Sequence, residues 1–81
     1  MIVLEREAYG GSTQTLHRFE NGYGASVLRG GFAYGGLELA VVKYLSDRRA
    51  ALCYDTPITD YVLGYLKEEE IPEILKRIEN L

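Results

Sequence analysis

The chain holds one histidine and one cysteine, and these are the residues whose types could do nucleophilic chemistry. A cysteine becomes a nucleophile when an imidazole in contact with it takes the thiol proton. Nothing in the sequence brings His17 and Cys53 together, so we expect a half-exposed strand histidine and a packed, inert thiol. One histidine and one distant cysteine also lack the ligand spacing of a zinc site. An enzyme built around Cys53 is therefore the last of the functions we consider, and no metal or cofactor is predicted.

Two glycines, Gly22 and Gly24, match the beginning of a phosphate-binding fingerprint. The third glycine of that motif is missing, because Val27 stands in its place. The motif also requires a turn from a strand into a helix, whereas these glycines follow a hairpin signal. We therefore do not predict a nucleotide site here.

Acidic residues gather at Glu68, Glu69, Glu70 and Glu73. Exposed carboxylates of this kind do not make a catalytic acid–base pair. At the start of a helix they are stabilised by the helix dipole alone, which is the commoner reason for such a run. Their second interpretation is an electrostatic complement to a basic partner, and we keep these four residues as candidates for partner binding.

A glycine-aromatic segment at residues 30–36 is the most distinctive part of the chain. Two Gly-Gly pairs bracket Phe32 and Tyr34, and glycines such as Gly31 and Gly35 admit backbone conformations with positive φ. A turn that holds two aromatic side chains away from the core favours contact with a partner. We predict Phe32 and Tyr34 as the anchors of that contact.

The first 55 residues predict a β meander. Residues 2–7 read as a strand, and Asn21-Gly22 between alternating runs predicts a hairpin with a type I′ turn. In its second strand Tyr23, Ala25 and Val27 should face the core. Residues 37–44 are apolar on both faces, as in a central strand, and residues 50–54 form the next strand.

The remaining residues, 56–81, predict helices. Pro57 ends the β region. Apolar residues at i, i+4 and i+8 indicate a short helix over residues 59–66, and an apolar stripe predicts a second helix with Pro72 in its first turn. The stripe consists of Ile71, Ile74, Leu75, Ile78 and Leu81. The fold class is α+β: one domain, residues 1–81, with an antiparallel meander of three to four strands packed against the C-terminal helix or helices.

Composition limits the function further. With 81 residues, 47% of them hydrophobic, the chain has one small core, and an uncovered sheet face favours a homodimer. Its single cysteine fits a reducing cytosol, and we expect neither a secretory signal nor a membrane span. The formal net charge is −3, and outside the C-terminal helix, which carries Lys76-Arg77, Arg48-Arg49 is the one cationic cluster. Despite seven tyrosines, direct nucleic-acid binding is therefore not expected.

Three stretches give the chain a family resemblance: FENGYGASV at residues 19–27, YGGLELAV at 34–41 and YDTPITD at 54–60. With the glutamate-rich C-terminal helix, they resemble small uncharacterised proteins of bacteriophages and prophages over about residues 16–81. The resemblance implies a setting, the cytoplasm of an infected bacterium, where inhibitors of host defence such as anti-CRISPR proteins are of similar size. It brings no known chemistry.

These observations lead us to expect a non-catalytic protein that binds and inhibits a host protein complex, such as a bacterial defence system. The alternative is a module that binds a small ligand or nucleotide and uses the glycine-rich loop as a lid.

Overall fold

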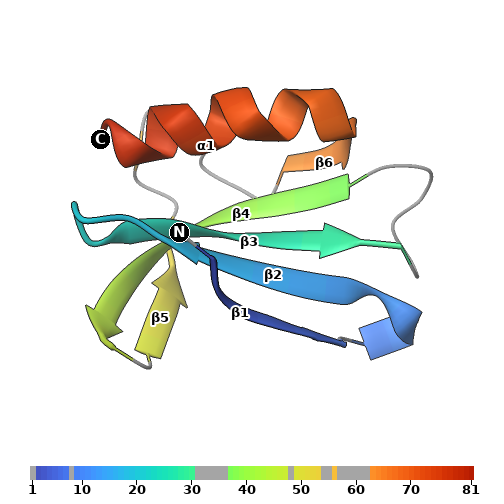
Figure 1. The fold of residues 1–81 in the computed structure, drawn as a ribbon, viewed down its shortest axis with the longest axis horizontal. Helices are drawn as coiled ribbons and strands as arrows, with labels where there is room; N and C mark the ends of the chain where they lie inside the picture. Colours follow the sequence, from blue (N-terminus) through green and yellow to red (C-terminus); the bar gives the residue numbers. More distant parts are fainter. Residues whose placement is uncertain (1, 8, 31–36, 48, 54–55, 57–62) are drawn as a thin grey trace.

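The computed structural model is an antiparallel sheet with one α-helix lying across one of its faces (Figure 1). It describes residues 2–7, 9–30, 37–47, 49–53, 56 and 63–81. The strands follow the order β1-β2-β3-β4-β5, and β6 also pairs with β4. Their bounds are Ile2–Glu7 (β1), Thr13–Arg18 (β2), Tyr23–Arg29 (β3), Leu37–Ser46 (β4), Arg49–Leu52 (β5) and Leu63–Leu66 (β6). The helical segments are η1 (Tyr9–Gly11), η2 (Glu68–Glu70) and α1 (Ile71–Glu79).

The core lies between α1 and the middle of the sheet. In β3, Ala25 and Val27 are fully buried, and Tyr23 packs against the same cluster, which confirms the predicted core face. Helix α1 buries Ile71 and Ile78, with Ile74 and Leu75 packed beside them. The predicted stripe is therefore correct for these four residues, and Pro72 lies in the first turn as expected.

The hairpin between β2 and β3 exists, but its turn differs from the prediction. A type I′ turn needs positive φ at both Asn21 and Gly22, and only Gly22 has it, with φ 87°. The Gly22 amide donates to the Phe19 carbonyl and the Phe19 amide to the Tyr23 carbonyl. This is the pattern of a type I turn followed by a glycine bulge. The side chain of Asn21 explains the difference, because its Oδ1 accepts from the Tyr23 amide.

Strand β4 is central, as its two apolar faces predicted. One of its edges pairs with β3, and the other is shared by β6 and β5 in succession. In the described part of the chain the sheet has six strands, more than the three or four expected. The meander from β1 to β5 alone exceeds that number, and the pairing of β6 with β4 is non-local and leaves no periodic signal.

The prediction of a short helix over residues 59–66 is wrong for the residues of this range that the structure describes, since residues 63–66 form β6. Leu63 pairs with Leu39 and Leu66 with Leu37, so both leucines serve the sheet. The α+β class is correct, with one α-helix in the described part of the chain. Within that part, no helix has the length and apolar character needed to cross a membrane.

Candidate functional site

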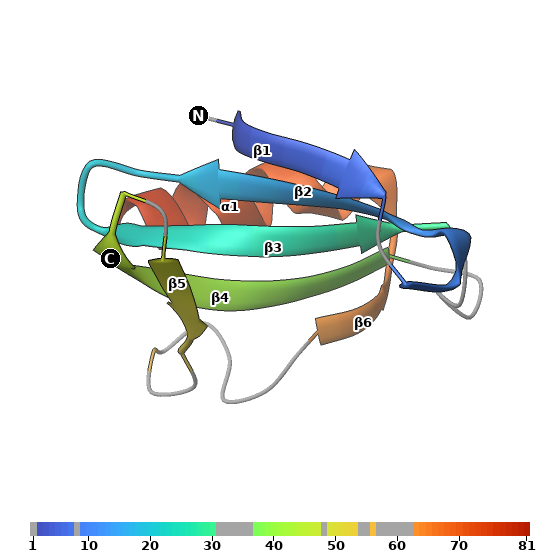
Figure 2. The same ribbon diagram turned by 90° about the horizontal axis from the view of Figure 1, so that it is seen from below.

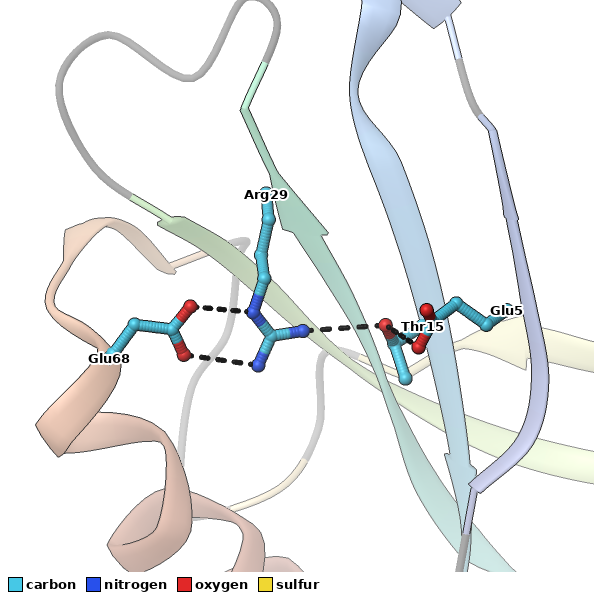
Figure 3. A network of polar contacts seen from close by, with 4 residues as sticks. All are labelled: Glu5, Thr15, Arg29 and Glu68. Carbon is cyan, nitrogen blue, oxygen red and sulfur yellow. Dashed lines mark hydrogen bonds and ion pairs between the residues drawn. The ribbon is translucent and has the colours of Figure 1, made fainter.

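The acidic turn before α1 is fixed to the sheet by an ion pair. Arg29 in β3 donates from Nε to Glu68 Oε2 at 2.8 Å and from Nη2 to Oε1 at 3.2 Å, a bidentate contact (Figure 3). The hydrogen bond from Arg29 is the main reason that the pKa of Glu68 lies below its ordinary value. Glu68 therefore serves to hold the start of the helical segment against β3.

The same guanidinium continues into a chain of hydrogen bonds across the sheet. Arg29 Nη1 donates to Thr15 Oγ1 at 3.3 Å, and Thr15 Oγ1 donates to Glu5 Oε2 at 3.3 Å. Figure 3 shows the four residues in line, from η2 through β3 and β2 to β1. This chain of hydrogen bonds links the helical layer to the edge strand β1.

Of the four candidate glutamates, two are used within the fold. Besides Glu68, Glu70 accepts from the Lys67 amide at 3.0 Å, which caps the turn. Glu69 and Glu73 are exposed and have no hydrogen-bond or ion-pair partner among the described residues. The part of the acidic run that is open to a partner is therefore Glu69 and Glu73.

Tyr65 is a residue that sequence reasoning missed. It is 76% exposed, and its φ of 57° makes it the one described non-glycine residue with positive φ. That conformation costs of order 1–3 kcal/mol for a residue with a Cβ, and such strain gathers at functional sites. Two residues separate Tyr65 from the acidic turn that begins at Glu68, in the region where β6 meets the start of α1 (Figure 1). No signal in the sequence distinguished it from the six other tyrosines.

The predicted loop anchors lie elsewhere in the chain. Phe32 and Tyr34, with Gly31 and Gly35, fall outside the described residues. Their role stays a prediction.

His17 is buried, which corrects the expected half-exposed position. It is 9% exposed, and its Nε2 has no hydrogen-bond partner among the described residues. Its pairing with Ala25 places it on the helix-covered side of the sheet. The predicted two-residue turn would have paired His17 with Ser26 on the other face, so the expected register did not reveal this burial. With Ile2, Glu5 and Arg29 it lines a groove of about 460 Å³, to which Thr13 and Thr15 also contribute.

The surroundings of His17 disfavour its protonated form. Desolvation is the main cause of its lowered pKa, and the positive charges of the chain N-terminus and Arg29 add to it. Glu5 on β1 also lines the groove and attracts the imidazolium, but the opposing effects are larger. A histidine held neutral in the folded state contributes stability above its unfolded pKa of about 6.5, and that stability is lost as the pH falls toward the folded pKa.

We therefore expect the free energy of unfolding to fall as the pH is lowered from 7 to below about 6. The variant His17→Phe should show a flatter dependence in this window, because no imidazole remains to be charged. Urea unfolding over a pH series measures both chains. The Glu68→Gln variant is the matched control: the pKa of the missing carboxyl lies below the ordinary range of a glutamate, so the variant should keep the parent's slope between pH 7 and 6. Equal slopes for His17→Phe and the parent would contradict the assignment.

The structure does not bring His17 and Cys53 together. His17 pairs with Ala25, Ala25 pairs with Val41, and the Cys53 amide donates to the Val41 carbonyl. Two strands therefore separate them, roughly 14 Å at the usual strand spacing. Cys53 is buried, as predicted.

No helix covers the opposite face of the sheet in the described part of the chain (Figure 2). A hollow of about 470 Å³ lies there, open to solvent. Its walls are mostly apolar, and they include Tyr44, whose buried hydroxyl has no hydrogen-bond partner in the part of the chain that the structure describes. The apolar wall consists of Val3, Leu4, Leu16, Val42, Ala50 and Leu52.

The described residues hold no group of three or more His, Cys, Asp or Glu side chains placed to bind a metal ion. Comparison of the chain with protein-family models, with curated proteins and with solved structures found no match. The geometry of the exposed surfaces is therefore the basis for the functional proposal.

Proposed function

We propose that the chain is a non-catalytic binding protein of the phage type that it resembles, and that it inhibits a host protein complex in the bacterial cytoplasm. A defence complex of the kind targeted by anti-CRISPR proteins is the expected target. The observation that carries the proposal is Tyr65, an exposed aromatic side chain held in a strained backbone conformation beside an acidic turn. Aromatic anchors of this kind dominate protein interfaces.

The exposed charges that follow Tyr65 in the chain favour a basic partner surface. Glu69 and Glu73 are exposed carboxylates without a partner among the described residues, and carboxylates on an interface rim steer association with opposite charge. Phe32 and Tyr34 remain proposed anchors of the same contact, and a homodimer remains a proposal for the oligomeric state.

We expect Tyr65→Gly to weaken partner binding by roughly tenfold or more, as the loss of an aromatic anchor does. Its stability should stay equal to the parent's or rise by up to about 1 kcal/mol, because glycine adopts positive φ without strain. Affinity purification from host lysate, followed by mass spectrometry, compares the parent, Tyr65→Gly and the control Tyr65→Phe, which keeps the ring. Proteins captured by the parent and by Tyr65→Phe but lost with Tyr65→Gly are the expected partners.

The charge contribution is measured on a partner purified in this way. Reversal of Glu69 and Glu73 to lysine should slow association and flatten its salt dependence. Identical capture by all three Tyr65 chains would refute the proposed contact.

A further inference from the structure

Strand β1 is an open edge of the sheet. It is the last strand in the pairing order, and Figure 2 shows it at the border of the sheet, with no described strand beyond it. All six of its residues are exposed. An edge strand presents unpaired backbone N–H and C=O groups, which can pair with another extended chain.

The two faces of β1 differ in chemistry. Glu5 and Glu7 pair with Thr15 and Thr13, and the hydrogen bond from Thr15 fixes Glu5 on the helix-covered side. On the uncovered side, Leu4 lines the hollow. The edge therefore offers two carboxylates on one face and, on the other, the apolar surface at Leu4 beside Arg6, which also lines the hollow and donates to Gln14 Oε1.

The hollow lies next to this edge. Its lining runs from Val3 and Leu4 in β1 through Leu16 in β2 to Val42 in β4. Side chains of a strand alternate between the two faces of a sheet. A strand added beside β1 would therefore direct every second side chain toward the apolar wall at Leu4, and the others would lie beside Glu5 and Glu7.

The charges of β1 distinguish between two kinds of partner for this edge: a second copy of the chain and a segment of another protein. A copy that paired antiparallel through the same half of β1 would set its own Glu5 and Glu7 beside these carboxylates, and like charges across strands destabilise pairing. Cationic side chains at the same positions are favourable. The edge thus disfavours its own copy and suits an occupant of opposite charge.

We propose that β1 binds an extended segment of a partner protein in which basic and apolar residues alternate. The segment extends the sheet by one strand, with its basic side chains beside Glu5 and Glu7 and its apolar side chains facing the hollow at Leu4. This surface lies at the opposite edge of the sheet from β6 and does not depend on the function proposed above.

The experiment uses the full chain and two peptides of identical lysine and valine composition. In one the residues alternate, and in the other all lysines precede the valines. We expect the alternating peptide to bind about tenfold more tightly, because only its pattern places both kinds of side chain correctly. It should also slow hydrogen exchange at alternate amides of residues 2–7, which NMR measures residue by residue. Equal affinities, or unchanged exchange in β1, would overturn the proposal.

Charge variants test the register of the contact. Glu7→Lys should weaken the alternating lysine–valine peptide about tenfold and improve binding of an alternating glutamate–valine peptide. Glu7 has no hydrogen-bond or ion-pair partner among the described residues, so the fold should tolerate this change. Glu79→Lys makes the same charge change at the end of α1 and should leave both affinities unchanged. Equal effects of Glu7→Lys and Glu79→Lys on the peptide affinities would overturn the proposal. It would also be overturned if light scattering showed a dimer without peptide and the amides of β1 were already protected from exchange in that dimer.

Discussion

Replacement of Gly24 by alanine should destabilise the fold by about 3 kcal/mol, near the upper end for overpacking in a well-packed core. A Cβ at this position would overlap the backbone carbonyl oxygen of His17 and lie 2.8 Å from Cε2 of Tyr44. The carbonyl belongs to β2, which pairs with β3 at this point, so it cannot move without disturbing the sheet. For a domain of this size the melting temperature should fall by roughly 12–24 °C. Urea and thermal unfolding followed by circular dichroism measure both quantities.

Gly64→Ala is the matched control, because a Cβ at Gly64 meets nothing within 4 Å and its φ is not positive. Its stability should equal the parent's or exceed it slightly, since alanine restricts the unfolded chain. A second variant, Gly24→Ala with Tyr44→Ala, separates the two obstacles. Removing the ring should not restore stability, because the carbonyl of His17 remains. Recovery of the parent's stability in that double variant would mean that the Tyr44 ring alone requires glycine here.

Local periodicity correctly predicted the core face of β3 and the apolar face of α1. The alternation at Tyr23, Ala25 and Val27 and the helical stripe from Ile71 to Ile78 both survive, because each follows from the geometry of a single element. Burial of His17 depends on the turn, since a two-residue type I′ turn at Asn21-Gly22 would pair His17 with Ser26 on the other face, whereas the observed turn pairs it with Ala25.

Non-local contacts account for the failures. The apolar spacing over residues 59–66 fits a helix, yet Leu63 and Leu66 pair with β4, and Tyr65 adopts a conformation that no helix allows. The ion pair of Glu68 joins it to Arg29, far away in the sequence, so the structural use of this glutamate was not visible. The acidic part of the proposed binding surface is thereby reduced to Glu69 and Glu73, Phe32 and Tyr34 stay a prediction, and Tyr65 is added to the proposal.

The turn at Asn21 also depends on a non-local contact, because the Asn21 side chain has a partner at the other end of the chain. Nδ2 of Asn21 lies 2.9 Å from the Ile78 carbonyl oxygen, 3.1 Å from that of Glu79 and 3.3 Å from that of Leu81. The last carbonyls of a helix have no partner within the helix, so this amide caps the C-terminus of α1. Asn21, which the sequence indicates only as part of a local hairpin turn, therefore also holds α1 against the sheet.

We expect Asn21→Asp to destabilise the fold by about 2 kcal/mol at neutral pH, and Asn21→Ala by about 1 kcal/mol. Both changes remove the donor, but aspartate also places a negative charge beside carbonyl oxygens at the negative end of the helix dipole. The free energy of unfolding, measured by urea denaturation for the parent and both variants, gives the two values. Asn80, at the same end of α1, provides a comparison, because its Nδ2 donates to the Lys76 carbonyl oxygen of its own helix, whereas Asn21 Nδ2 lies near three carbonyl oxygens and joins the helix to the sheet. Asn80→Asp should therefore cost less than Asn21→Asp.

The pH dependence isolates the charge in the same experiment. Protonation of the new carboxyl below its ordinary pKa of about 3.9 removes the repulsion and restores an O–H donor. The difference between Asn21→Asp and Asn21→Ala should therefore vanish or reverse between pH 7 and pH 3. Comparing the two variants at each pH cancels the shared loss of the Arg29–Glu68 ion pair in acid, which affects both equally. A difference that stays constant across this range would contradict the electrostatic part of the cap, and equal stability of Asn21→Ala and the parent would contradict the cap itself.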